Sequence, residues 1–210
     1  QQIESKHPDC IARLRSPITP GVTSSSPRPA SSAPRNGSGK TLGFMGREWR
    51  RKGLPKVIEI WRVLSQDQPK LRLHLAGFPI DTPLGLTESE RKRVELRDWV
   101  TDKPSFFNDL DLLLHPARLE AYGMVVAEAM AMQVPVLCSR ECGAADDVKK
   151  DFGAAIQYDA PVSEWADRAA SLLDSCKVIF GFELFAAVSP SVREVFPNAR
   201  ASMGIGYGLT

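Results

Sequence analysis

Long hydrophobic stretches are missing from this chain of 210 residues. No apolar run approaches the ~20 residues that a membrane-spanning helix requires, and no secretory signal is recognisable. The four cysteines, Cys10, Cys138, Cys142 and Cys176, form no CxxC pair, and no histidine stands at the spacing of a zinc site. These absences predict a cytoplasmic protein without a metal site. Because Cys138 ends an apolar run, we expect it to be a reduced thiol in the core.

A strong excess of charge of one sign is also absent. The formal net charge is +2 at pH 7, which is too small to argue for a nucleic-acid partner. The hydrophobic content of 43% and the charged content of 25% are ordinary for a globular protein. The length allows one full-sized domain, or one domain and a fragment of another.

The composition changes along the chain and predicts four segments. Residues 1–22 are too short to fold alone, and residues 23–40 have the Ser, Pro, Gly and Arg content of a flexible linker. Residues 41–176 alternate strand-like and helix-like apolar patterns, which predicts an α/β domain with a parallel sheet. In residues 177–210 the apolar residues follow neither period, and we predict no structure for this tail.

The pattern within residues 41–176 predicts individual elements. Strands are expected at residues 41–45, 71–77, 94–100, 112–114, 135–138 and 154–158. Helices are expected at residues 54–64, 103–110, 124–132 and 163–173, with a further short helix between residues 139 and 148. Residues 88–93 are expected to form a charged helical turn or a surface segment.

Two glutamates mark the stretch from residue 111 to 138. Glu120 follows a buried strand, and the carboxyl ends of parallel strands form the crevice where α/β proteins bind ligands. Glu128 lies inside an almost wholly apolar helix, where a carboxylate is costly unless it is hydrogen-bonded. That helix begins near residues 122–123, and its N–H groups and dipole favour an anion. Taken singly, Glu120 is explained by a solvated loop and Glu128 by a buried Arg or Lys partner; together they indicate a ligand with an anionic part and several hydroxyls.

A basic loop, residues 46–53, follows the first expected strand and begins and ends on glycine. If the strands are parallel, this loop lies at the same edge of the sheet as Glu120. Arg47 and Lys52 stand next to the two glycines, and we interpret them as cations for a phosphate. Arg50 and Arg51 are interpreted as solvated loop residues.

Three further residues are interpreted as structural. His74 lies within an expected strand and is expected to be a satisfied histidine rather than a ligand. Phe106 and Phe107 lie in a short helix and are expected to pack in the core rather than to stack on a base.

The motifs of the domain occur in a fixed order. They are Gly46-Arg47…Lys52-Gly53, Leu75-Ala-Gly77, Asp98-Trp99-Val100-Thr-Asp102, Asp111-Leu-Leu-Leu-His115-Pro116, Glu120-Ala-Tyr-Gly123…Glu128-Ala-Met-Ala131, Val134-Pro-Val136 and Cys142-Gly143. Over residues 41–160 this set resembles the C-terminal half of the retaining glycosyltransferases of family 4. The Arg-Lys-Gly and Cys-Gly details also resemble the lipopolysaccharide-core glucosyltransferase branch. The resemblance implies a Rossmann-like, doubly wound parallel sheet, which is one half of a GT-B fold.

The resemblance also implies an activity and a set of site residues. Such an enzyme moves a sugar from a nucleotide diphosphate-sugar to a glycan or lipid-linked acceptor, keeps the anomeric configuration and needs no metal or other cofactor. Arg47 and Lys52 would hold the diphosphate, Glu120 would contact the donor sugar, and these three are the implied catalytic residues. The implied nucleotide-sugar-binding residues are Gly46, Trp99, Val100, Ala121, Tyr122, Gly123, Met124 and Glu128. Among them Glu128 would accept hydrogen bonds from the ribose, and the turn at Trp99 and Val100 would border the nucleobase.

The chain departs from that family at its beginning. Only residues 1–22 precede the linker, where the family has a complete acceptor-binding domain, and residues 18–22 resemble the junction to that domain. We therefore expect an incomplete enzyme for polysaccharide or lipopolysaccharide biosynthesis that turns over poorly alone. Two alternatives remain open: a module that binds a nucleotide-sugar without catalysis, and a protein whose basic loop docks on a partner or on anionic lipid at the inner face of the membrane.

Overall fold

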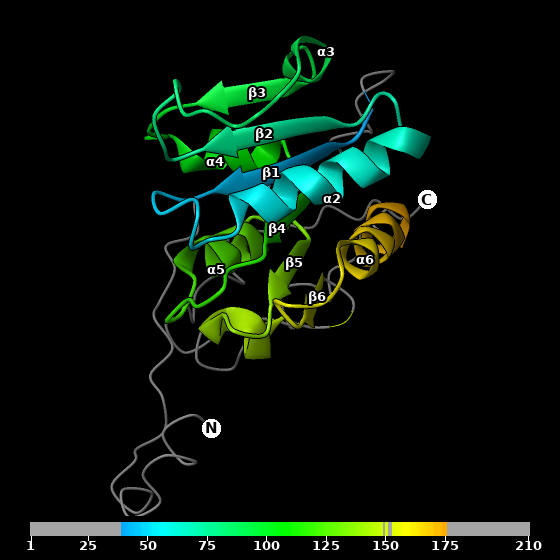
Figure 1. Ribbon diagram of the computed structural model, residues 1–210. Helices are drawn as coiled ribbons and strands as arrows, with labels where there is room; N and C mark the ends of the chain where they lie inside the picture. Colours follow the sequence, from blue (N-terminus) through cyan, green and yellow to red (C-terminus); the bar gives the residue numbers. More distant parts are fainter. Residues whose placement is uncertain (1–38, 149, 151–152, 176–210) are drawn as a thin grey trace, which may run out of the picture.

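The computed structural model of the protein describes residues 39–148, 150 and 153–175. The expectations for residues 1–22 and 177–210, and for most of the linker, lie outside this part. Within it, six parallel strands form one sheet in the order β3-β2-β1-β4-β5-β6 (Figure 1). The strands are β1 (Thr41–Met45), β2 (Arg72–Ala76), β3 (Val94–Arg97), β4 (Leu112–His115), β5 (Val136–Ser139) and β6 (Gly153–Ile156).

Helices connect successive strands, and a last described helix follows β6. They are α2 (Leu54–Asp67), α3 (Glu88–Arg91), α4 (Lys103–Asn108), α5 (Met124–Ala131) and α6 (Val162–Ser175), with a 3-10 helix, η2 (Gly143–Asp147). The chain starts in the middle of the sheet, runs outward through β2 and β3, and returns to place β4 on the other side of β1. This reversal makes the sheet doubly wound, and it confirms the predicted Rossmann-like α/β class. None of the described helices is long and apolar enough to cross a membrane.

The sheet separates two apolar clusters. Leu112 and Leu114 of β4 pack with α2 and α6, whereas Leu113 packs with α4 and α5, because successive strand residues point to opposite faces. Trp61 and Trp165 are completely buried on the α2–α6 side. Phe106 and Phe107 are buried on the other side, which confirms that they belong to the core. In Figure 1 α2 and α6 cover the near face of the sheet, and α4 and α5 lie behind it.

Two predictions, the end of strand β3 and the role of His74 in β2, bear on the site. The strand predicted for residues 94–100 ends at Arg97, because its partner β2 stops at Ala76 and the chain turns away at Gly77 with a φ of 89°. The turn at residues 98–100 is therefore a loop at the carboxyl edge of the sheet. His74 is buried in β2, with its Nε2 atom 3.2 Å from a carboxylate oxygen of Glu95. Neither of its ring nitrogens has a hydrogen-bond partner among the described residues, so the expectation of a fully satisfied histidine was wrong.

Candidate functional site

Two loops meet at the carboxyl edge of the sheet, on either side of the point where its strand order reverses. One is the β1–α2 loop (residues 46–53) and the other is the β4–α5 loop (residues 116–123). Gly53 has a φ of 86°, and a Cβ atom there would lie 2.0 Å from the carbonyl oxygen of Pro116. The backbone N–H of Arg118 also donates to the carbonyl of Arg51 at 3.0 Å. The glycine is therefore what allows the basic loop to reach the loop that carries the first glutamate.

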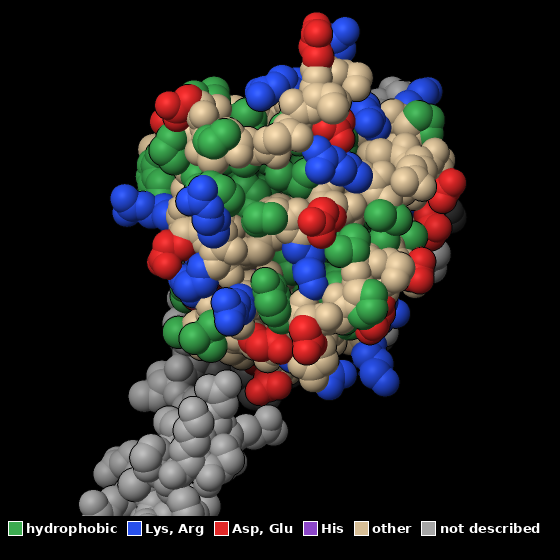
Figure 2. All heavy atoms as spheres, in the orientation of Figure 1, with side chains coloured by type: hydrophobic (Ala, Val, Ile, Leu, Met, Phe, Trp, Pro, Cys, Tyr) green, Lys and Arg blue, Asp and Glu red, His purple; other side chains and the backbone are tan. Residues whose placement is uncertain are grey.

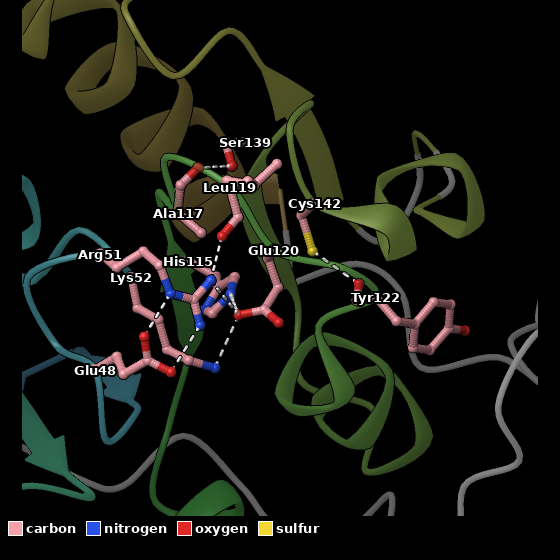
Figure 3. A network of polar contacts seen from close by, with 10 residues as sticks. All are labelled: Glu48, Arg51, Lys52, His115, Ala117, Leu119, Glu120, Tyr122, Ser139 and Cys142. Atoms are coloured by element: carbon pink, nitrogen blue, oxygen red, sulfur yellow. Dashed lines mark hydrogen bonds and ion pairs between the residues drawn. The ribbon is translucent and has the colours of Figure 1, made fainter. Parts of the chain in front are cut away.

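The glycine at the other end of the basic loop makes room for a lysine. A Cβ atom at Gly46 would lie 2.4 Å from Cδ of Lys52, so the lysine side chain passes directly over this glycine. The ammonium of Lys52 then reaches Oε2 of Glu120 at 2.9 Å (Figure 3). Only 19% of the Lys52 side chain and 13% of the Glu120 side chain are exposed. The sequence predicted a solvated loop as the simple explanation of Glu120, and the structure instead places it in a largely buried ion pair.

A second cation belongs to this pair, and it is not the expected one. Nη1 of Arg51 lies 3.7 Å from Oε2 of Glu120 and also donates to the carbonyl of Leu119. The Nε atom of Arg51 donates to Glu48 at 2.8 Å, and this hydrogen bond raises the pKa of Arg51 and lowers the pKa of Glu48. The Arg51 side chain is 37% exposed, in keeping with its interpretation as a loop residue in contact with solvent, but it also reaches Glu120, which the sequence did not indicate.

Arg47 points elsewhere in the structure. Its guanidinium carbon lies 5.4 Å from the centre of the Trp99 ring, a cation–π distance. Trp99 is 62% exposed at the end of β3, and Val100 beside it is half-buried. Arg50 lies over the ring of Trp49 in the same way and stays exposed. Figure 2 shows Lys and Arg side chains gathered over the region that the β1–α2 loop occupies in Figure 1.

The backbone around Glu120 is held from the β5 side. The Glu120 N–H donates to the Glu141 carbonyl at 3.0 Å, and the Gly143 N–H donates to the Glu120 carbonyl at 3.1 Å. The thiol of Cys142 donates to the carbonyl of Tyr122 at 3.0 Å. A Cβ atom at Gly123, where φ is 93°, would lie 2.4 Å from that sulfur. The Cys-Gly motif therefore fixes the turn that leads into α5.

Helix α5 begins at this turn. Gly123 is its N-cap, and the N–H groups of its first turn lie beside Glu120, whose Cγ would be 3.4 Å from a Cβ atom at Gly123. Ala121 and Met124 are exposed here. The hydroxyl of Tyr122 donates to Asp147 at 2.9 Å, and burial together with this contact raises the pKa of the phenol. The helix start and the first glutamate thus form one continuous edge.

Glu128 has a partner of its own. Its Oε1 atom lies 2.6 Å from the ammonium of Lys103, at the start of α4. The Glu128 side chain is 19% exposed and that of Lys103 is 43% exposed. This contact matches the simple explanation given above, a glutamate in an apolar helix satisfied by a lysine, although Lys103 is more exposed than expected.

Sequence reasoning left one buried residue of the site without a role. His115 ends β4, is completely buried, and has its Nε2 atom 3.9 Å from Oε2 of Glu120. Burial and the nearby charge of Lys52 lower its pKa to about 4. The available signal was a histidine that follows a run of three leucines and directly precedes a proline.

Two cysteines of the predicted set lie in the described part of the chain. Cys138 and Cys142 are both buried and free, as expected of Cys138. A hydrogen bond with Cys142 and burial raise the pKa of Cys138, so its thiol stays protonated. No group of three or more His, Cys, Asp or Glu side chains suited to a metal ion is found among the residues that the structure describes, and a metal-independent reaction stays a prediction.

Comparisons with known proteins agree on a family. The profile of the glycosyl transferases of group 1 matches residues 39–175. The chain is 28% identical over 113 residues to the capsular polysaccharide biosynthesis glycosyltransferase CapM of Staphylococcus aureus, covering 51% of this chain and 30% of CapM. It is 30% identical over 149 residues to the lipopolysaccharide core biosynthesis mannosyltransferase LpsB of Rhizobium meliloti (strain 1021), covering 58% of this chain and 42% of LpsB.

Solved structures share the fold. TarM superposes with a TM-score of 0.69 at 18% identity, covering 93% of this chain and 41% of TarM. The C-terminal domain of a group 1 glycosyl transferase (LpcC) from Francisella tularensis superposes with a TM-score of 0.55 at 18% identity, covering 78% of this chain and 87% of that domain. The chain therefore spans well under half the length of the curated relatives and of TarM, but most of the isolated domain. It belongs to the glycosyl transferases of group 1, and its sheet has the Rossmann-like architecture of their GT-B neighbours.

Proposed function

We propose that this domain binds the donor of a retaining glycosyltransferase, which moves a sugar from a nucleoside diphosphate-sugar to a glycan or lipid-linked acceptor. The observation that carries the proposal is the cluster at Glu120, where Lys52 and Arg51 converge on one carboxylate oxygen at 2.9 and 3.7 Å. A diphosphate carries more negative charge than one carboxylate and presents more acceptor oxygens. It therefore competes with Glu120 for both cations.

The diphosphate is the leaving group of the reaction. As the glycosidic bond breaks, negative charge grows on the phosphate oxygen, and a fixed cation stabilises that charge where it develops. Lys52 and Arg51 are the pair we assign to this role, because the meeting of the two loops holds both in place. The N–H groups at the start of α5 lie at the same edge and favour the same anion.

Glu120 is released from its cations when they turn to the diphosphate. Its carboxylate then accepts hydrogen bonds from hydroxyls of the donor sugar, together with the backbone from Ala121 to Met124. The reaction passes through an oxocarbenium-like transition state, and a nearby carboxylate favours the positive charge of that state. Retention of the anomeric configuration belongs to the proposal.

We assign the nucleoside to the surroundings of Glu128 on helix α5. Lys103 holds only one oxygen of Glu128, which leaves the other to accept from ribose hydroxyls. Trp99 follows β3 and Arg47 of the β1–α2 loop lies over its ring, and we assign both to the border of the nucleobase. Arg47 remains a second candidate for the diphosphate.

The relatives support the proposal for the acceptor and the biological process. The chain covers 30% of CapM and 41% of TarM, so the complete reaction is assigned to a two-domain arrangement in which another domain binds the acceptor. A mutant of S. aureus TarM was crystallised in complex with fondaparinux, alpha-GlcNAc-glycerol and UDP. We propose a comparable nucleotide for this chain, and the synthesis of a surface polysaccharide or lipopolysaccharide as its pathway. The basic loop supports docking at the inner face of the membrane.

A binding panel tests the proposal. Thermal unfolding of the chain is followed with UDP, ADP and GDP and with UDP-glucose, UDP-N-acetylglucosamine, ADP-glucose and GDP-mannose. The nucleotides that carry one of the three bases should raise the melting temperature of the chain more than the others, since a ligand at 100 times its Kd adds ~2.7 kcal/mol to the stability of the folded state. Titration calorimetry then gives the affinities, with uridine and inorganic phosphate as fragment controls. Failure of every nucleotide to bind would refute the proposal, and binding without transfer by the complete two-domain protein would make the chain a binding module.

A further inference from the structure

His115 is a polar side chain that the proposed reaction does not use. It ends β4, its exposed fraction is 0%, and neither ring nitrogen has a hydrogen-bond partner among the described residues. A buried polar group without a partner destabilises the folded state. The three residues before it, Leu112–Leu114, show that a leucine suits this strand. A feature that weakens the fold at this position calls for a functional reason.

The position of the ring supplies that reason. Nε2 of His115 lies 3.9 Å from Oε2 of Glu120, the same oxygen that Lys52 reaches at 2.9 Å (Figure 3). A distance of 3.9 Å is too long for a hydrogen bond, and a shift of the carboxylate by ~1 Å would close the gap. Lys52 therefore forms the ion pair with Glu120 in this structure, and His115 is close enough to bind the same oxygen after a small shift of the carboxylate.

The backbone holds the imidazole at this place. His115 is paired with Cys138 of β5, and its carbonyl accepts from the N–H of Ala117 at 2.9 Å. The hydroxyl of Ser139 donates to the carbonyl of Ala117 at 2.5 Å and fixes the next turn. The backbone that carries the ring is therefore fixed and the ring is completely buried, so we expect the carboxylate to move toward the ring.

The charge state of the ring suits a partner of this kind. Because burial and Lys52 lower its pKa to about 4, the imidazole is neutral at pH 7 and can carry its proton on Nε2. A neutral donor directs a carboxylate without cancelling its charge, whereas a third cation would form an ion pair with the carboxylate and cancel that charge.

We propose that His115 is a positioning residue for Glu120, which takes over the carboxylate from Lys52 when the donor binds. Lys52 turns to the diphosphate, Oε2 moves onto Nε2–H of His115, and the other oxygen of Glu120 stays aimed at the sugar hydroxyls. Among the described residues, Lys52, Arg51 and His115 have a nitrogen within 4 Å of this oxygen, so His115 is the donor that remains once both cations turn to the diphosphate. This inference rests on the proposed function, and it adds a residue and a step to that function.

Three variants test it with two ligands. His115→Leu removes the donor, His115→Gln keeps an amide N–H close to the Nε2 position, and His74→Leu makes the same change at a buried histidine of β2 that lies beside Glu95. For each, calorimetry measures the Kd of the nucleotide-sugar that binds tightest in the panel above and the Kd of its parent diphosphate. The ratio of the two isolates the sugar contacts, and the melting temperature reports on the fold.

We expect His115→Leu to worsen this ratio about tenfold or more, which corresponds to the loss of one hydrogen bond to a charged group. Its melting temperature should rise by about 3 °C, because an unpartnered polar group is gone. His115→Gln should return the ratio to within about twofold of the wild type. His74→Leu should leave the ratio unchanged.

The opposite results are equally clear. An unchanged ratio in His115→Leu, or an equal loss of both ligands with a lower melting temperature, would make His115 a structural residue and overturn the inference. A His115→Gln variant as poor as His115→Leu would do the same, because the donor would not be what matters. If the wild-type chain binds no nucleotide at all, the proposed function fails and this inference fails with it, which separates the two cases.

Discussion

The two glutamates of the site have very different surroundings. Glu120 lies where two loops meet, with nitrogen atoms of Lys52, Arg51 and His115 at 2.9, 3.7 and 3.9 Å from one carboxylate oxygen. Glu128 lies on a helix and has one charged partner, Lys103, whose side chain is 43% exposed. The first is the centre of a cluster built from distant parts of the chain, and the second is half of a pair that borders water.

This difference decides how each site responds when a partner is removed. A charge in a largely buried cluster cannot move to water, so the loss of its counter-charge is strongly felt. A lysine that is already 43% exposed can return to water, and exposed ion pairs contribute only ~0–1 kcal/mol. We therefore expect changes at the Glu120 cluster to exceed those at the Glu128 pair, in both stability and binding.

The largest effect is expected for Lys52→Met. It removes the proposed diphosphate cation and leaves Glu120 with Arg51 alone. Nucleoside diphosphates should bind about 10–100-fold more weakly, since a hydrogen bond to a charged group contributes roughly 1.5–3 kcal/mol. The free energy of unfolding should fall by roughly 1–2 kcal/mol, less than for a fully buried pair, because Arg51 remains. Calorimetry and urea unfolding measure the two quantities.

Arg50→Met is the matched control for that variant. It removes the same charge from the same loop, but Arg50 is exposed and lies over Trp49. Its affinity for nucleoside diphosphates should stay within about threefold of the wild type. If the two variants lose the same affinity, the loop acts only through its net charge, and the contrast between the clusters disappears.

An intermediate effect is expected for Glu128→Gln. The amide keeps the shape and one acceptor but loses the charge, so ribonucleoside diphosphates should bind about 5–10-fold more weakly. The 2′-deoxy forms, which lack one of the proposed partners, should lose less. Calorimetry with UDP and 2′-deoxy-UDP, or with the pair that the panel selects, gives both numbers. Equal losses for the two forms would remove Glu128 from the ribose.

The sequence was sufficient to predict the strands and helices and to place Lys52 and Glu120 at the same edge of the sheet. Apolar periods of two and 3.6 residues identify strands and helices locally, and parallel connections bring the loops after β1 and β4 together. What it could not supply is the direction of each side chain in a loop. Arg47 was favoured over Arg51 because it follows a glycine, yet Arg51 faces Glu120 and Arg47 faces Trp99.

The reason is that loop direction is set by contacts across the sequence. Arg51 lies close to Glu120 because Gly53 allows its loop to touch Pro116, and because the backbone N–H of Arg118 donates to the Arg51 carbonyl. The same holds for His115, whose strand was predicted but whose neighbours were not. Lys103 could not be paired with Glu128 from the sequence either, because 25 residues separate them.

The smallest effect is expected for Lys103→Met. The variant leaves the Glu128 carboxylate in place and takes away a partner that binds one oxygen only. The remaining carboxylate is 19% exposed and can still accept from a ribose. Binding of nucleoside diphosphates should therefore change by less than about threefold, and Lys103→Arg should behave as the wild type. A loss as large as that of Glu128→Gln would mean that Lys103 itself contacts the nucleotide. The pair would then resemble the Glu120 cluster, in which cation and carboxylate act on one ligand, and the contrast between the two glutamates would be one of exposure rather than of role.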